Sequence, residues 1–155
     1  MTREAFIARH SALFEHSPWV VERAAASLPF ADVHAGLMAV VYKASPDEQL
    51  GLIRAHPELA GKAAVDRTLT EASAAEQASA GLDRLKPAEF DRFHALNAAY
   101  RKRFDFPFII CVRLTDKAGI LSAMERRIGN PRDVEIVTAL DQIGEIVRLR
   151  LADLA

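Results

Sequence analysis

The C-terminal stretch of residues 130–155, NPRDVEIVTALDQIGEIVRLRLADLA, carries the most regular hydrophobic pattern in the chain. Its apolar positions recur at helical spacing after an Asn-Pro pair; they are Ile136, Leu140, Ile143, Val147, Leu151 and Leu154. At about 100° per residue, Arg150 lies within roughly 50° of the centre of this stripe, whereas Arg148 points more than roughly 100° away. The stretch predicts a long amphipathic helix that turns Arg150 toward the core and Arg148 toward water.

An arginine on the apolar face of a helix needs a partner, because burying an unpaired guanidinium costs several kcal/mol. Two interpretations of Arg150 remain open from the pattern alone. It either forms a structural ion pair, with its aliphatic part lying along the core, or it binds an anionic ligand.

Helix-start signals recur through the rest of the sequence, whereas strand signals are scarce. The only good strand candidate is FPFIICVRL, residues 106–114, and one short apolar run cannot make a sheet. We therefore predict an all-α fold, a single-domain helical bundle of about seven or eight helices over residues 1–155. The expected helix starts are Ser17-Pro18, Asp32, Ser45-Pro46, Pro87, Thr115 or Asp116, and Asn130-Pro131.

The composition gives no indication of a nucleic-acid-binding or membrane protein. The chain has 155 residues with 20 basic and 21 acidic side chains, so no basic face indicates a nucleic-acid partner. No apolar run approaches the length of a membrane span, and we expect no membrane association. A single cysteine, Cys111, excludes an internal disulfide and suits a reducing compartment, so the expected location is cytoplasmic.

The stretch RAHPELAGK, residues 54–62, contains the first candidate for chemistry. Pro57 disfavours helical geometry at His56, so the histidine is expected where a helix ends. An imidazole titrates near neutral pH, and loops on a rigid scaffold often carry catalytic groups. The pattern alone leaves open whether His56 is catalytic or only part of a surface turn.

A second candidate lies in SAAEQASAGL, residues 73–82. Its S-x-x-E spacing is that of a capping box, in which Ser73 caps a helix and Glu76 bonds back to the Ser73 amide. Alternatively, Glu76 and Gln77 in the opening turn of a helix present hydrogen-bonding groups to a ligand. The spacing does not choose between the two.

Other kinds of active site lack their motifs. The remaining histidines show no metal-binding spacing, and the chain has no P-loop, dinucleotide fingerprint or nucleophile elbow. Cys111 lies in an apolar run that favours a buried, inert thiol, and Trp19, Phe90 and Phe93 are expected in the core. We expect no metal site and no cofactor.

Several motifs in their order resemble the 2-oxo-4-hydroxy-4-carboxy-5-ureidoimidazoline (OHCU) decarboxylase family of the urate-to-allantoin pathway. They are FEHSPWVVERA, AHPELAGK, SAAEQASAGL, NAAYRKRFDFPFIICV and the closing E-x-x-x-A-L-x-x-I-x-x-I-x-x-L-R-L, and they cover nearly the whole chain. One departure is Asp105, which stands where the family commonly has glycine. The resemblance implies the all-α fold expected above.

The resemblance also implies site residues. The catalytic positions are His56, Glu76 and Arg150, which selects Arg150 over Arg148 as helical phase does. We hypothesise that His56 handles protons, that Glu76 accepts substrate N–H groups and orients His56, and that Arg150 makes a forked contact with a substrate oxygen. The implied substrate contacts are Pro57, then Ser73, Ala74, Ala75, Glu76 and Gln77, and the backbone of Phe108, Ile109, Ile110, Cys111 and Val112.

The implied activity is cofactor-independent decarboxylation of OHCU to (S)-allantoin and CO2, the last step of urate-to-allantoin conversion in purine catabolism. The implied partners are this small-molecule substrate and a second copy of the chain in a homodimer. One alternative is a non-catalytic helical interaction module, in which His56, Glu76 and Arg150 do not converge. Another is a related decarboxylase of a different small nitrogen-rich acid.

Overall fold

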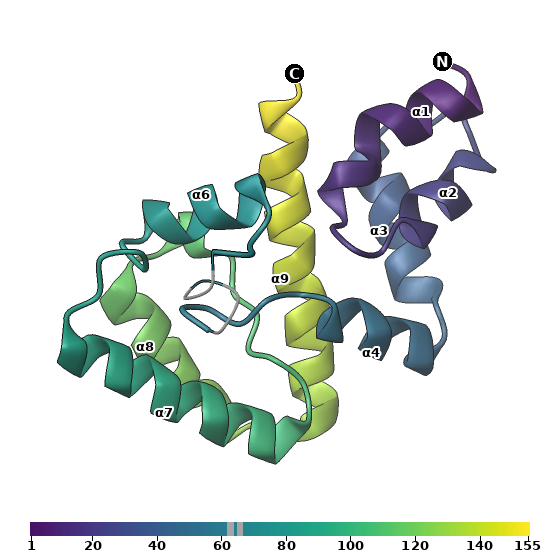
Figure 1. The fold of residues 1–155 in the computed structure, drawn as a ribbon. Helices are drawn as coiled ribbons and strands as arrows, with labels where there is room; N and C mark the ends of the chain where they lie inside the picture. Colours follow the sequence, from purple (N-terminus) through teal and green to yellow (C-terminus); the bar gives the residue numbers. More distant parts are fainter. Residues whose placement is uncertain (62–63, 65–66) are drawn as a thin grey trace.

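The computed structural model describes residues 1–61, 64 and 67–155. These ranges contain eight α-helices, two short 3₁₀ helices and no strand, which confirms the all-α prediction (Figure 1). The elements are α1 (Arg3–His10), η1 (Ser11–Leu13), α2 (Trp19–Ala25), α3 (Val33–Lys43), α4 (Pro46–Arg54), α6 (Glu71–Ser79), α7 (Pro87–Phe104), η2 (Val112–Leu114), α8 (Lys117–Arg127) and α9 (Arg132–Asp153).

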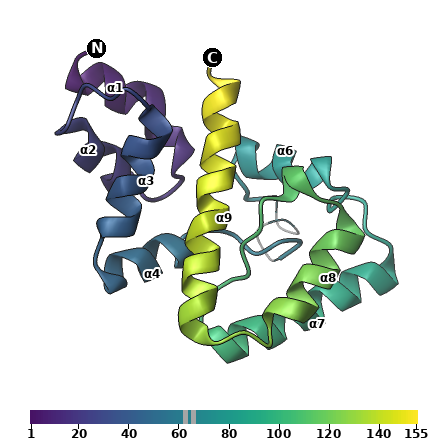
Figure 2. The same cartoon turned by 180° about the vertical axis from the view of Figure 1, so that it is seen from behind.

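Helix α9 runs through the middle of the molecule. Helices α1 to α4 lie on one side of it and α6 to α8 on the other, as both views show (Figures 1 and 2). Of its predicted stripe, Leu140, Ile143 and Val147 are buried, and Ile136 and Leu151 are half-buried. The prediction was wrong for Leu154, which is 38% exposed because it caps the end of α9 that projects beyond α6.

The predicted helix starts are mostly confirmed. Three capping side chains accept a hydrogen bond from the amide three residues ahead, and Pro87 is the first residue of α7. The Ser17 cap was wrong, because α2 begins at Trp19 and has Pro18 at its N-cap with no side-chain hydrogen bond. The three confirmed caps are Asp32, Ser45 and Asp116.

An aromatic cluster fills the core between α7 and the chain that follows it. The Tyr100 ring packs edge-on against Phe108 at 5.2 Å between centroids. Phe93 is fully buried as predicted, and Trp19 packs half-buried against the core. Phe90, also expected in the core, is 37% exposed because it lies in the first turn of α7.

The strand candidate, residues 106–114, forms no sheet. Residues 107–111 form no regular secondary structure, and η2 follows them. The amide of Cys111 donates to Oε1 of Gln142 on α9 at 2.9 Å, which fixes this segment beside the central helix. The apolar run therefore packs into the core as an irregular segment and not as a strand.

Asp105 occupies the residue after α7, in the left-handed region with φ of 61°. Glycine adopts this conformation without cost, whereas other L-residues lose roughly 1–2 kcal/mol. Here the Asp105 carboxylate pairs with Arg54 at 3.0 Å, and its carbonyl accepts from the same guanidinium at 3.1 Å. The contact joins the end of α7 to the end of α4, just ahead of His56.

Among the described residues, no helix combines the length and the apolar character that crossing a membrane requires.

Candidate active site

A cavity lies between the end of α4, helix α6, the segment leading into η2, and α9. His56, Glu76 and Arg150 all contribute to its wall, so the three side chains converge. The interaction-module alternative predicted that they do not. The lining residues are His56, Pro57, Leu59, Ser73, Glu76, Gln77, Phe108, Ile109, Ile110, Cys111, Val112, Arg113, Ile146 and Arg150.

Two of the expected substrate contacts lie elsewhere. Ala74 and Ala75 are exposed and do not line this cavity, because they occupy the outer face of α6 while Ser73, Glu76 and Gln77 occupy its inner face. Leu59, Arg113 and Ile146 also line the cavity and were not among the predicted contacts. Leu59 belongs to the HPELA motif and Ile146 to the closing motif of α9, whereas no motif singles out Arg113.

His56 lies two residues beyond the end of α4, as the following proline predicted. Its Nδ1 is 2.9 Å from the carbonyl oxygen of Leu52. Since a carbonyl can only accept, Nδ1 carries the hydrogen, and Nε2 is the basic nitrogen of the neutral ring. The hydrogen bond thus selects the tautomer that can take up a proton at Nε2.

The pKa of His56 is lowered from its ordinary value of 6.5. Desolvation is the main cause, and the positive charge of Arg150 acts in the same direction. The Leu52 carbonyl and the charges of Glu15 and Glu76 oppose the shift without cancelling it. His56 is therefore a neutral base at neutral pH.

Two buried amide side chains hold the loop that follows His56. Oε1 of Gln77 accepts from the Ala60 amide at 3.0 Å, and its Nε2 donates to the Glu58 carbonyl at 3.3 Å. Asn97 of α7 donates to the Leu59 carbonyl at 2.8 Å. Gln77 lines the cavity, but both the oxygen and the nitrogen of its amide group form hydrogen bonds that fix the loop after His56.

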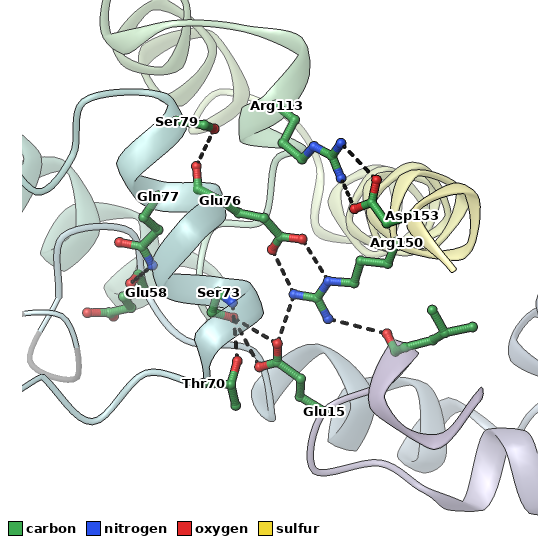
Figure 3. A network of polar contacts seen from close by, with 11 residues as sticks. Glu15, Glu58, Thr70, Ser73, Glu76, Gln77, Ser79, Arg113, Arg150 and Asp153 are labelled. Carbon is green, nitrogen blue, oxygen red and sulfur yellow. Dashed lines mark hydrogen bonds and ion pairs between the residues drawn. The ribbon is translucent and has the colours of Figure 1, made fainter. Parts of the chain in front are cut away.

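Glu76 and Arg150 form a two-pronged ion pair at the cavity wall (Figure 3). Nε of Arg150 donates to Oε2 of Glu76 and Nη2 donates to Oε1, both at 2.7 Å. The capping-box interpretation was wrong, because Thr70 caps α6 by accepting from the Ser73 amide. Glu76 consequently lies in the second turn, where its side chain reaches α9.

The Arg150 guanidinium has two further partners. Glu15 lies 2.9 Å from Nη2, and Nη1 donates to the Leu13 carbonyl at 3.3 Å. The forked edge that was expected to bind substrate is thus occupied by Glu76. Arg150 is only 8% exposed, as helical phase predicted, and Arg148 is exposed and pairs with Glu145.

Burial by itself lowers the pKa of Arg150, but its partners outweigh burial. The hydrogen bonds and charge of Glu76, followed by the charge of Glu15, raise the pKa above its ordinary value. The guanidinium therefore keeps its positive charge in the cavity wall.

The segment from Phe108 to Val112 forms the opposite wall, and all five of its residues line the cavity. Arg127 of α8 donates to the Ile109 carbonyl at 2.8 Å, and Gln142 accepts the Cys111 amide. The Cys111 thiol is buried as expected, and burial raises its pKa. Of the backbone amides proposed for substrate contact, that of Cys111 already has a protein acceptor.

The arrangement combines a neutral base, a carboxylate and a fixed positive charge around a mainly apolar cavity. Within the described ranges, no group of three or more His, Cys, Asp or Glu side chains is placed to hold a metal ion. These groups can exchange a proton with a bound molecule and accept its N–H groups.

Comparison with known proteins gives one consistent family. The family model for OHCU decarboxylase matches residues 1–152. A relative from Haloferax volcanii, named 2-oxo-4-hydroxy-4-carboxy-5-ureidoimidazoline decarboxylase, is 43% identical over 97% of this chain and 89% of its own length.

Two solved structures share the fold. The chain resembles a crystal structure of (S)-allantoin synthase with a TM-score of 0.75 and 30% identity, over 99% of this chain and half of that one. A crystal structure of OHCU decarboxylase in the presence of (S)-allantoin gives a TM-score of 0.70 at 22% identity, over 89% of this chain and 91% of that one.

Proposed function

The chain belongs to the OHCU decarboxylase family, and we propose that it converts OHCU to (S)-allantoin and CO2 in urate degradation. The single observation that carries this proposal is the convergence of His56, Glu76 and Arg150 on one cavity in a chain of this family. A decarboxylase needs groups that hold the substrate, stabilise developing charge and deliver a proton to one face.

The substrate supplies its own electron sink. Its carboxyl and hydroxyl groups share one ring carbon, and the neighbouring carbon, which bears the ureido group, is doubly bonded to nitrogen. When the bond to the carboxylate breaks, its electron pair forms a ring C=C bond and the C=N pair moves to nitrogen, which takes up a proton. Loss of the hydroxyl proton and protonation of the ureido-bearing carbon then give allantoin, with one proton consumed overall. We therefore propose that the reaction needs no cofactor.

His56 is the proton-handling group in this proposal. Nε2 takes the hydroxyl proton and returns a proton to the ureido-bearing carbon, while the Leu52 carbonyl holds the ring through Nδ1. Because His56 is fixed at one wall, the proton arrives on one face of the ring, and a single enantiomer results.

Glu76 accepts hydrogen bonds from the ring or ureido N–H groups, and Arg150 keeps the Glu76 carboxylate in place. Arg150 also presents positive charge to a substrate oxygen, through a guanidinium that it shares with Glu76 and Glu15. The remaining proposed contacts are Pro57, Ser73 and the amides of residues 108–112 other than that of Cys111.

We further propose that residues 1–155 act as one domain, in the cytoplasm and as a homodimer. The lone buried Cys111 suits a reducing compartment, and the dimer follows from the family resemblance. Light scattering of the purified chain decides the oligomeric state, since a mass of one chain contradicts the dimer.

The test of the proposed function is formation of (S)-allantoin from freshly generated OHCU, followed by optical rotation. The unmodified chain should produce optically active allantoin faster than the spontaneous background. His56→Ala should lower kcat by about 10²–10⁴-fold, the usual contribution of a positioned acid–base group. Circular dichroism checks that the variant folds; a folded His56→Ala variant with near-normal turnover refutes the assignment of the base.

The matched control for His56→Ala is His94→Ala, which removes an exposed imidazole of α7. Its kcat should equal that of the unmodified chain. Supplying other small nitrogen-rich acids in the same assay tests the alternative of a related decarboxylase, because a preferred turnover of one of them makes OHCU the wrong substrate.

A further inference from the structure

Glu15 is a nearly buried carboxylate to which the mechanism above assigns no task. It follows η1, and its side chain is 10% exposed. One oxygen lies 2.9 Å from Nη2 of Arg150, and both oxygens accept from the Ser73 hydroxyl, at 3.1 and 3.0 Å. The side chain thus joins the N-terminal part of the chain to α6 and α9 (Figure 3).

The contacts of Glu15 complete the support of the Arg150 guanidinium. Glu76 binds its Nε–Nη2 edge, and Leu13 accepts from Nη1. A planar guanidinium that is paired only with one carboxylate can still rotate together with that carboxylate. A second carboxylate on Nη2 fixes the plane of the guanidinium. Glu15 does not line the cavity of His56, so its contacts can act on the reaction only through Arg150 and Ser73, and its charge can act on His56 from a distance.

We infer that Glu15 is a positioning residue for the decarboxylation, holding Arg150 and Ser73 so that Glu76 faces the cavity in one orientation. This inference rests on the proposed function. Misplacing a reacting or binding group by about 1 Å can lower the rate about 10²-fold. The orientation of Glu76 therefore depends on a residue from the opposite side of α9.

A charge effect gives Glu15 a second signature. Three charged groups act on His56, namely Arg150, which lowers its pKa, and Glu15 and Glu76, which raise it, alongside burial and the Leu52 carbonyl. Replacing Glu15 by glutamine removes one of the two opposing negative charges. The pKa of His56 should then fall further, which reports whether the Glu15 charge acts on the cavity.

The kinetic test compares Glu15→Ala and Glu15→Gln with Glu145→Gln. The control breaks another glutamate–arginine pair of α9, that with Arg148, on the surface. Glu15→Ala should lower kcat by about tenfold to a hundredfold, with KM changed much less. Glu15→Gln should lose less, because its amide oxygen still accepts from Ser73, and Glu145→Gln should remain within about twofold.

A second readout needs no turnover. The Nε–H resonance of Arg150, identified by its loss in Arg150→Lys, should move in Glu15→Ala and stay in place in Glu145→Gln. The titration of His56, followed by NMR, should shift to lower pH in Glu15→Gln. Should Glu15→Ala not fold, the isosteric glutamine variant supplies both readouts.

The outcomes separate the two proposals. An unmodified chain that does not decarboxylate OHCU refutes the proposed function, and the NMR readouts then test only whether Glu15 holds Arg150. If the unmodified chain is active, both Glu15 variants keep kcat within about twofold and the Arg150 and His56 signals do not move, Glu15 is only structural and the inference is overturned.

Discussion

Two buried arginine–glutamate pairs use the same chemistry in different surroundings. Glu135, fully buried, accepts from Arg127 at 2.8 Å, from the Tyr100 hydroxyl at 2.6 Å and from Asn130 at 2.9 Å. The Arg127 guanidinium also lies 4.3 Å from the Phe108 ring centroid. Protein atoms surround this pair, whereas both members of the Arg150–Glu76 pair line the cavity.

The surroundings decide what each pair does. The Arg127–Glu135 pair ties α8, α9 and the cavity-lining segment together, because Arg127 also donates to the Ile109 carbonyl. It supports the wall from behind, and neither of its members lines the cavity. The Arg150–Glu76 pair has its polar groups in the wall itself, so it can exchange partners with a ligand. A buried ion pair alone therefore does not indicate an active site, whereas a pair that lines a cavity is placed to contact a ligand.

The largest expected effect is on stability, from breaking the enclosed pair. Glu135→Ala leaves Arg127 charged in the core and removes the acceptor of Tyr100 and Asn130. Loss of one partner of a buried pair costs about 3–5 kcal/mol of unfolding free energy. Urea denaturation measures this loss, and the surface variant Glu145→Ala should lose no more than about 1 kcal/mol. Equal losses in the two variants would contradict the importance of enclosure.

The second effect is on catalysis, from altering the pair at the cavity. Arg150→Lys keeps a positive charge but cannot bond both oxygens of Glu76, so the carboxylate loses its fixed orientation. We expect kcat to fall by about 10²-fold and the urea midpoint to change little. The measurement is the optical-rotation assay on the folded variant.

The same helix supplies the control for that prediction. Arg148→Lys alters an exposed arginine two residues away and should leave kcat within about twofold. Comparable losses at both positions would undermine the assignment by helical phase.

The features that depend on local sequence patterns could be predicted, namely the orientation of the two arginines on α9 and the end of α4. The 3.6-residue period of α9 was enough to turn Arg150 inward and Arg148 outward, and proline was enough to end α4 before His56. Local spacing failed at α6, because T-x-x-S and S-x-x-E both fit a helix start. The helix uses the earlier cap at Thr70.

The partners of the arginines could not be predicted, because they depend on tertiary packing. Glu15 is 58 residues from Ser73 in the chain, and no periodicity relates the two. The pairing of Arg127 with Glu135 spans the turn between α8 and α9, and its burial depends on the aromatic cluster of α7. Helical phase could indicate that Arg150 needs a partner but not that Glu76 and Glu15 fill that need.

The smallest expected effect is the pH dependence that distinguishes the cavity from the enclosed core. His56 must be neutral to take a proton, and its pKa lies below 6.5 through desolvation and the Arg150 charge, opposed by the Leu52 carbonyl, Glu15 and Glu76. The acid limb of kcat/KM for the unmodified chain should therefore be centred below pH 6.5, and kcat/KM should fall tenfold per pH unit below the midpoint of that limb.

The linkage has the same sign for stability. The unfolded chain binds the His56 proton more readily than the folded chain, so this stabilising contribution is present above pH 6.5 and is lost as the pH falls toward the folded pKa. Initial decarboxylation rates measured between pH 5 and 8 locate the acid limb of kcat/KM. Each rate is divided by the concentration of folded protein at that pH, so that acid unfolding is not mistaken for protonation of His56. If kcat/KM instead falls around a pH above 6.5, Glu15 and Glu76 raise the pKa of His56 by more than burial and Arg150 lower it. The cavity then stabilises the imidazolium, which contradicts the assignment of His56 as a neutral base.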